Sequence, residues 1–297
     1  MYDDGYLNLL SHDSFAGGVP HKTFERLRKE NPLSWTDGNA ETNGFWNLTR
    51  HADIALANRE GRVFSSAKGI RLEDQSHEEY MARRTFQETD APEHTATRRL
   101  VNGNFAKPVV GRFEGLIREL ASYIADKALE KTEFDAVDAM AKQLPMMMLG
   151  RILGVPDEDL DWLVERGDAL IGNSDPDFTD HVVDKMDTSA YRFMPFRSPA
   201  GVELYDYAAD LLENRRAVAE DGILAKMMQD ENGLKELEFK NFFCLLVAAG
   251  NDTTRYSIAM ALNLLAHNYQ LIAQLRTGEY WDTCADEFIR LASPTMH

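Results

Sequence analysis

One segment constrains the fold more than any other: residues 238–268 carry an almost continuous apolar helical pattern. Nearly every face of its first half is apolar, through Phe242, Phe243, Leu245, Leu246 and Val247. A single helix over these 31 residues would be roughly 46 Å long. Because a helix that is apolar all round has no face to turn to water, the pattern predicts burial in the middle of a large helical domain.

A run of poor helix formers, Ala-Gly-Asn-Asp-Thr-Thr, interrupts this segment from Ala249 onward. Gly250 would let a flat ligand or small molecule approach the backbone closely. Thr253 can turn its hydroxyl back to the carbonyl of Ala249, which opens a local groove beside the ionisable Asp252. These features predict a proton-handling pocket in an apolar wall. The alternative is that Asp252 pairs with Arg255 at i,i+3 and that the threonines fill space.

The rest of the chain is also predicted to be mostly helical. Apolar residues recur at spacings of three and four over residues 111–131, 141–154, 203–219 and 282–292. Two short strands, residues 33–35 and 44–49, follow each other at hairpin distance near the N-terminus. No repeat, low-complexity tract or linker divides these elements. The sequence therefore predicts one mainly α domain over residues 1–297, with a small N-terminal β-sheet.

The charge and cysteine content exclude several function classes. The chain has 49 acidic and 32 basic side chains, a net charge of −17, which repels nucleic acid and anionic membrane surfaces. Its two cysteines are too few for a disulfide framework, which favours a reducing cytosol. No secretory signal is visible, and the longest apolar run, residues 242–249, is too short to cross a bilayer. We therefore expect a soluble cytoplasmic protein that binds no nucleic acid and no membrane.

A second group of polar residues marks a helix start near residue 90. Asp90 is a candidate N-cap, and Glu93 stands three residues later, as in a capping box. His94 and Arg98 then share one helix face at i,i+4, which suits a carboxylate or phosphate partner. The alternative is a basic face exposed to solvent.

A third group lies near the end of the chain, where Glu287 and Arg290 stand at i,i+3 on a helix that Ser293-Pro294 ends. An exposed ion pair that contributes a few tenths of a kcal/mol is the simplest interpretation. The alternative is a buried pair that organises neighbouring loops.

The order and spacing of these motifs resemble the soluble bacterial branch of the cytochrome P-450 family, whose members are haem-thiolate monooxygenases. The chain contains Pro-Glu-His-Thr-x-x-Arg-Arg after the cap, then Ala-Gly-Asn-Asp-Thr-Thr, then Glu-x-x-Arg closing on Ser-Pro. Phe64-Ser65-Ser66 and Leu153-Gly154-Val155-Pro156 fit lesser landmarks of the family. The resemblance runs from about Pro20 to the last residue. It implies the cytochrome P-450 fold, with helices B to K and a small N-terminal β-sheet.

The resemblance also implies a role for individual residues. The acid–alcohol pair that handles protons during oxygen activation matches Asp252 and Thr253. The residues that match haem-binding positions are His94, Arg98, Ala249, Gly250 and His297. The candidate substrate contacts are Val247, Ala248, Thr295 and Met296, with the loop at residues 192–199 as a mobile lid. Glu287 and Arg290 match a structural pair, and no residue of this chain is assigned to the metal.

The implied activity is insertion of one atom of O2 into a small apolar substrate, such as a terpenoid, a steroid or a long aliphatic chain. The implied cofactor is haem b, and the implied electron donor is a ferredoxin or a flavodoxin-type protein. The alternative from a different class is a haem-free protein that binds a lipid-like ligand and has lost catalysis.

One departure from the family pattern concerns the iron ligand. Family members supply it from a Phe-x-x-Gly-x-x-x-Cys-x-Gly loop that follows the helix of Glu287 and Arg290, and this sequence contains no such loop. Cys244 and Cys284 lack the flanking glycines, so we expect inert, buried thiols. We therefore expect the chain to be the N-terminal portion of a longer protein, without the C-terminal haem-ligand loop and the last helix.

Overall fold

The computed structural model describes residues 7–183, 185–214, 223–229 and 234–294. Helices dominate these residues, as predicted, and the one β-sheet found among them has two strands. The contacts of the chain divide it into two compact units, Met1–Arg98 and Arg99–His297. A single domain over residues 1–297 stays a prediction.

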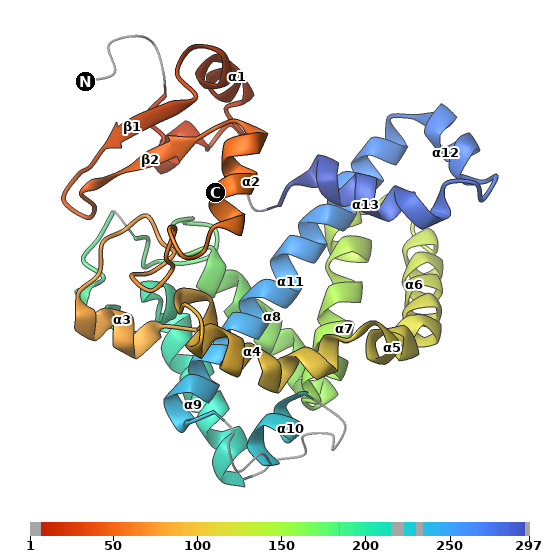
Figure 1. The fold of residues 1–297 in the computed structure, drawn as a ribbon. Coiled ribbons are helices and arrows are strands. Elements are labelled where there is room, and N and C mark those ends of the chain that lie inside the picture. Colours follow the sequence, from red (N-terminus) through yellow and green to blue (C-terminus); the bar gives the residue numbers. More distant parts are fainter. Residues whose placement is uncertain (1–6, 184, 215–222, 230–233, 295–297) are drawn as a thin grey trace. The chain divides into compact units, whose positions relative to one another are not determined.

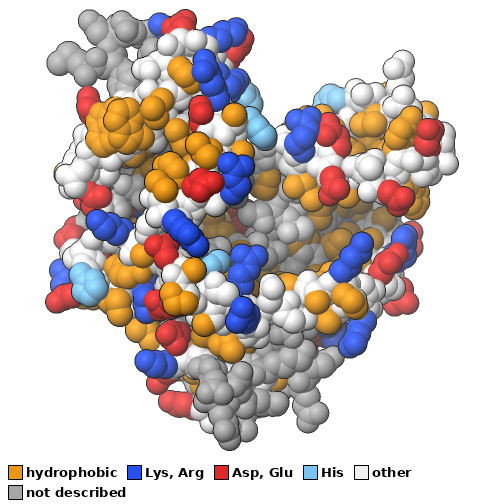
Figure 2. Space-filling model, in the orientation of Figure 1, with side chains coloured by type: hydrophobic (Ala, Val, Ile, Leu, Met, Phe, Trp, Pro, Cys, Tyr) orange, Lys and Arg blue, Asp and Glu red, His pale blue; other side chains and the backbone are white. Residues whose placement is uncertain are grey.

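The first unit contains the β-sheet and several short helices (Figure 1). Their bounds are α1 His21–Glu30, β1 Leu33–Asp37, β2 Gly44–Leu48, α2 His51–Arg59, α3 His77–Arg83 and the first part of α4 Glu93–Asn102. The two strands are antiparallel and pair Trp35 with Trp46, whose rings meet edge-on with centroids 5.4 Å apart. Hydrophobic side chains gather on the surface over this hairpin (Figure 2). The predicted hairpin is thus confirmed.

The predicted capping box at Asp90 is wrong. The carboxylate of Asp90 instead accepts hydrogen bonds from the Ser65 hydroxyl at 2.5 Å and the Ser66 backbone N–H at 3.0 Å. Glu93 forms an ion pair with Arg84 at 2.7 Å. Donors from distant parts of the chain therefore compete successfully with the local backbone N–H groups that a capping box would use.

The second unit has helices and no β-strand within its described residues (Figure 1). Its helices are α5 Lys107–Val110, α6 Glu114–Leu129, α7 Gln143–Leu153, α8 Leu160–Ile171, α9 Pro199–Asn214, α10 Ile223–Gln229, α11 Glu236–Ala266, α12 Tyr269–Leu275 and α13 Trp281–Ala292. The predicted helix over 203–219 corresponds to α9, although residues 215–219 lie outside the described residues. None of the helices within the described ranges is long and apolar enough to span a membrane.

The long helix α11 is the centre of the second unit and has the predicted length of 31 residues. It contacts α7, α8, α9 and α13, and the buried residues of α11 lie in its first half. Phe243 and Val247 are both fully buried. A Cβ atom added to Gly167 of α8 would lie 3.1 Å from Cγ1 of Val247, so the glycine lets α8 approach α11 closely. The all-round apolar pattern therefore predicted the central helix correctly.

Candidate active site

The hexapeptide at residues 249–254 continues the helix without a break. Successive side chains of an α-helix are rotated by about 100°, so positions three or four apart share a face. The segment therefore presents three different faces: one with Ala249 and Thr253, one with Gly250 and Thr254, and one with Asn251, Asp252 and Arg255.

The first face carries the predicted side-chain hydrogen bond, and the helix continues through it. The Thr253 hydroxyl donates a hydrogen bond to the carbonyl oxygen of Ala249 at 3.0 Å, as expected from the sequence. Ala249 is exposed, although the residues just before it are buried in the core. This face thus offers a small, flat apolar position beside a hydroxyl group, within a helix that is otherwise closely packed.

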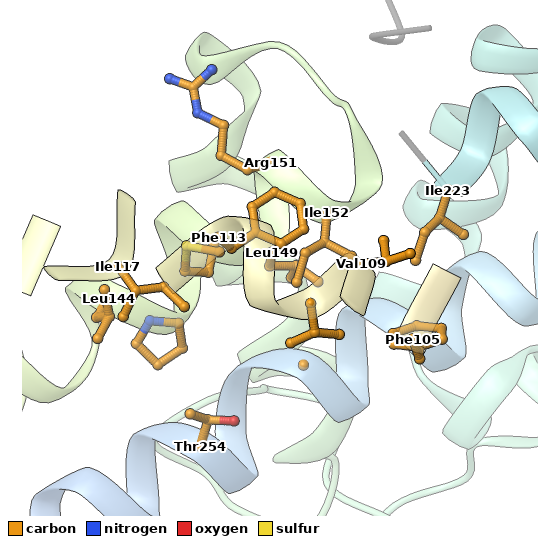
Figure 3. Close-up of a pocket in the computed structure, with 14 residues that line it drawn as sticks. Phe105, Val109, Phe113, Ile117, Leu144, Leu149, Arg151, Ile152, Ile223 and Thr254 are labelled. Atoms are coloured by element: carbon orange, nitrogen blue, oxygen red, sulfur yellow. The ribbon is translucent and has the colours of Figure 1, made fainter. Parts of the chain in front are cut away.

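The second face lines an apolar pocket of about 390 Å³ inside the second unit (Figure 3). Its apolar lining comes from the region of α5 to α7, with Phe105, Val109, Phe113, Ile117, Leu149 and Ile152 among the residues. Figure 3 shows these side chains gathered near Thr254, while the guanidinium of Arg151 points away from them. Arg151 instead pairs with Asp157 at 3.2 Å.

The packing gives Gly250 a different role from the expected approach of a ligand to the backbone. A Cβ atom at this position would lie 2.8 Å from Cδ1 of Leu149, so the close approach is made by α7. Gly250 therefore serves the contact between α7 and α11 in this structure, and its contact with haem stays a prediction.

The third face holds a network of charged residues. Arg255 donates from Nη2 to Oδ1 of Asp252 at 2.6 Å, which confirms the i,i+3 pair that was the simpler of the two interpretations. The same guanidinium donates from Nη1 to both carboxylate oxygens of Asp168 on α8, at 2.8 and 2.9 Å. Asp252 is therefore one end of an interhelical network rather than part of an isolated surface pair.

Two further residues complete this network. Asn251 donates from Nδ2 to Oδ1 of Asp168 at 3.1 Å, and Lys142 places Nζ 3.7 Å from Oδ2 of the same carboxylate. Burial disfavours the charge on Arg255, but the hydrogen bonds and charges of Asp168 and Asp252 outweigh it and raise the pKa of Arg255 above its ordinary value. The guanidinium is therefore a permanent cation between the two carboxylates.

Sequence reasoning missed Asp168, although a signal was present. Asp168 follows Leu160, Val164 and Gly167 on the apolar face of α8, where an acidic residue is unusual. An acidic residue on the buried face of a helix indicates a cationic partner elsewhere in the fold. The sequence offered no means to choose Arg255 as that partner.

His94 and Arg98, two of the predicted haem-binding residues, lie one helical turn apart on α4. The His94 ring stacks on Phe86 with centroids 5.7 Å apart, and Arg98 is exposed. Neither side chain forms an ion pair with any residue in the described ranges. An unpaired guanidinium next to an imidazole is a donor set that fits a carboxylate group.

The predicted substrate contacts divide into two groups. Val247 and Ala248 are buried, with Val247 packed against Gly167, so both belong to the core between α8 and α11. Substrate contact from these two residues stays a prediction that their burial does not favour. Thr295, Met296 and His297 lie outside the described residues.

The loop between α8 and α9 contains the predicted lid. Asn173 donates from Nδ2 to the carbonyl oxygen of Phe196 at 2.6 Å, which joins the two ends of the loop. Phe196 and Arg197 have φ angles of 56° and 49°, in the left-handed region that non-glycine residues rarely adopt. The movement of this loop stays a prediction.

Glu287 and Arg290 form an ion pair on α13 with hydrogen bonds of 2.7 and 2.8 Å. Both side chains are exposed, which confirms the simpler interpretation of an exposed pair for the described structure. A structural role for the pair toward haem stays a prediction.

The two cysteines differ in exposure. Cys244 is buried inside α11, and this burial raises the pKa of its thiol. Cys284 is half-buried on α13 and directs its thiol to the carbonyl oxygen of Trp281 at 3.6 Å. The expected burial is thus confirmed for Cys244, whereas Cys284 is more accessible, and the inertness of both thiols stays a prediction.

We expect a thiol reagent at neutral pH to label one cysteine of the native chain quickly and both cysteines of the unfolded chain. Only the thiolate reacts, and burial of Cys244 suppresses both its ionisation and the access of the reagent. Mass spectrometry of the labelled protein would identify the site, with Cys284→Ser as the control that removes the fast label. Rapid labelling of Cys244 in the native protein would contradict the packing of α11.

Comparison with known proteins tests the family resemblance that the sequence motifs indicated. No family model matches the chain. Cytochrome P-450 126 of Mycobacterium tuberculosis is 31% identical over 97% of this chain and 70% of its own length. The steroid C26-monooxygenase of Mycolicibacterium smegmatis is 30% identical over 93% of this chain. The chain spans 64% of the length of that monooxygenase.

Solved structures show the same similarity at the level of the fold. A cytochrome P-450 of Mycobacterium marinum, in complex with pseudoionone, has a TM-score of 0.75 and 29% identity, and the match covers 88% of this chain and 64% of that one. A second bacterial structure, from Novosphingobium aromaticivorans, has a TM-score of 0.75 at 23% identity and covers 93% of this chain and 67% of that one. These matches confirm the fold class that the sequence motifs predicted.

Proposed function

Because the chain belongs to the cytochrome P-450 family, we propose that it forms part of a haem-dependent monooxygenase that inserts one atom of O2 into an apolar substrate. One observation carries the proposal within this chain. The Thr253 hydroxyl donates a hydrogen bond to the Ala249 carbonyl, and Asp252 occupies the adjacent position of the same helix, just after the buried residues of its first half. A hydroxyl and an ionisable acid at adjacent helix positions can together pass a proton.

The donor set of α4 supports haem b as the cofactor. We assign the two propionates to His94 and Arg98, because both side chains can donate hydrogen bonds and neither is engaged in an ion pair within the described residues. Ala249 is assigned to the haem face, since its small, exposed side chain permits close approach of a planar group, whereas the packing of Gly250 against Leu149 gives its predicted haem contact no support. When bound, haem supplies the oxidising chemistry. Neither Cys244 nor Cys284 is assigned to the iron.

Asp252 and Thr253 are the proposed proton-handling pair. Asp252 accepts a hydrogen bond from Arg255 through Oδ1, and Oδ2 has no hydrogen-bond partner among the described residues. Its side chain is 38% exposed, so the free oxygen can take a proton from solvent. Thr253 can then accept and donate through a hydroxyl that is already oriented by the Ala249 carbonyl.

The proposed substrate is a steroid, a terpenoid or a long aliphatic chain. This class follows from the names of similar proteins, a steroid C26-monooxygenase and a methyl-branched lipid omega-hydroxylase, and from a similar structure that contains pseudoionone. We assign the loop at residues 192–199 as a lid over the substrate, because it carries Phe193, Met194 and Phe196. The proposed electron donor is a ferredoxin or a flavodoxin-type protein, and the proposed compartment is the cytoplasm, where both cysteines would stay reduced.

A carbon monoxide difference spectrum of the reduced monooxygenase of which this chain is proposed to form part, purified with the segment that supplies the iron ligand, tests this function. We expect the red-shifted Soret band that is typical of thiolate-ligated haem. A screen of steroids, terpenoids and fatty acids for substrate-induced shifts of the same band would then identify the substrate class. Complete absence of haem absorbance, combined with tight binding of a lipid-like ligand, would overturn the proposal and indicate a haem-free binding protein.

A further inference from the structure

The network around Arg255 is asymmetric. Asp168 uses both of its carboxylate oxygens: Oδ1 accepts from Arg255 and Asn251, and Oδ2 accepts from Arg255 and lies 3.7 Å from the Lys142 ammonium. Asp252 has a single hydrogen bond to the guanidinium, through Oδ1. One carboxylate is therefore held in place on all sides, whereas the other retains a free oxygen.

Burial follows the same asymmetry. The side chain of Asp168 is 9% exposed and that of Arg255 is 14% exposed, while that of Asp252 is 38% exposed. Hydrogen bonds between charged groups strengthen as water is excluded, so the Asp168–Arg255 contact is the stronger of the two. Nη1 of Arg255 lies between both oxygens of Asp168, and Nη2 donates to Asp252, so the anchored nitrogen determines where the second nitrogen meets Asp252.

The backbone places Asp168 and its partners for this contact. Asn251 is fully buried on α11 and directs its amide at Asp168 across the interface with α8. A turn of π-helix, Val137–Ala141, ends immediately before Lys142 and packs against α11. Such turns shift the side chains that follow them relative to a regular helix. Two elements besides α8, namely α11 and the junction of the π-helix with α7, therefore supply groups to the Asp168 carboxylate.

We propose that Asp168 is a positioning residue for Asp252 and acts through Arg255. Asp168 fixes the guanidinium, and the guanidinium fixes Oδ1 of Asp252, so that Oδ2 is presented in one orientation for proton transfer. The role of Asp168 rests on the proposed function, because that function requires Asp252 to deliver a proton. It extends that function to a residue on α8, 84 positions before Asp252 in the sequence, that no motif marks.

A purely stabilising ion pair would not need this arrangement. Asp252 and Arg255 alone could form a common i,i+3 pair on the helix surface. The network contains two negative and two positive side chains: Asp168 and Asp252, and Arg255 and Lys142. Because these charges balance, loss of either acid leaves one more positive than negative charge. The two losses have different structural consequences, because only Asp168 holds the guanidinium from both oxygens.

The difference between the two acids can be measured in the chain without haem. Nitrogen NMR of protein labelled at arginine reports how fast the Nη protons of a guanidinium exchange with water, and Arg255→Lys identifies the Arg255 signals. We expect Asp168→Asn to speed the exchange of the Arg255 Nη protons by on the order of tenfold or more, because the negative charge is lost and one acceptor oxygen is replaced by an NH2 donor. We expect Asp252→Asn to leave most of the protection in place.

The matched control is Asp161→Asn, which makes the same chemical change at an exposed position of the same helix. It should leave the Arg255 signals unchanged. Equal loss of protection in Asp252→Asn and Asp168→Asn, or unchanged protection in Asp168→Asn, would overturn the proposal. If Asp168→Asn does not fold, Asp252→Asn decides alone: retained protection supports Asp168 as the anchor, and lost protection excludes it.

The haem-loaded protein provides the functional measurement. Asp168→Asn should lower the turnover number by about tenfold while the substrate dissociation constant stays within about twofold, whereas Asp161→Asn should change neither. Unchanged turnover in Asp168→Asn would show that Asp168 anchors Arg255 without positioning Asp252 for catalysis. If the protein binds no haem, the proposed function fails, and the NMR comparison still decides the anchoring role.

Discussion

Thr253→Ala is expected to preserve substrate binding in the haem-loaded protein and to divert reducing equivalents into hydrogen peroxide. The hydroxyl of Thr253 is held by the Ala249 carbonyl at 3.0 Å, and alanine keeps the helix while it removes this proton donor and acceptor. A positioned acid–base group contributes about a hundredfold or more to a proton-transfer step. We therefore expect the amount of product per reducing equivalent to fall by about tenfold or more.

Product and hydrogen peroxide would be measured together against the consumption of reductant. The matched control is Thr254→Ala, since Thr254 is the next residue of the same helix but lines the pocket on a different face. Thr253→Ser should restore much of the coupling because it restores the hydroxyl. Tight coupling in Thr253→Ala, or equal uncoupling in Thr254→Ala, would contradict the assigned role.

Phe243→Ala is expected to cause the largest loss of stability among single truncations on the buried half of α11. Phe243 is fully buried, and its ring stacks on Tyr207 of α9 with centroids 5.7 Å apart. Removal of the ring loses its burial and leaves a cavity between α9 and α11, at a cost of about 3–5 kcal/mol in the free energy of unfolding. The loss should appear as a lower urea midpoint, followed by circular dichroism.

The control for this substitution is Phe64→Ala, which removes the same side-chain volume at a position that is 51% exposed. Its effect should stay within about 1 kcal/mol, as for most surface substitutions. A loss below about 1 kcal/mol for Phe243→Ala would mean that α9 does not pack on α11 as described. A similar loss for both variants would point to an effect on the unfolded chain instead.

The substitutions on α11 separate two tasks that the helix performs. Phe243 and Val247 hold α9 and α8 against the helix, whereas Thr253 carries a proposed chemical role that costs little stability. Exposure differs accordingly, since the first two side chains are fully buried and Thr253 is not. We therefore expect stability and coupling to be lost independently in the two classes of variant.

The sequence by itself determined the features that depend on local periodicity. The length of α11, the hairpin of β1 and β2, and the hydrogen bond from Thr253 to Ala249 all follow from residues within one or two turns of each other or at hairpin distance. The order of short motifs along the chain also identified the family. These predictions were confirmed because the interactions behind them are encoded within short stretches of sequence.

Only the tertiary structure decided which distant groups meet. Asp168 and Arg255 are 87 positions apart in the sequence. Asp90 does not form the predicted capping box, because its carboxylate accepts a hydrogen bond from Ser65, 25 positions upstream. Gly250 proved to face Leu149 of α7 rather than an open approach for a ligand. A helix pattern shows which face is buried but not which helix covers it, because many pairs of apolar faces pack equally well and charged partners meet only after the helices have docked.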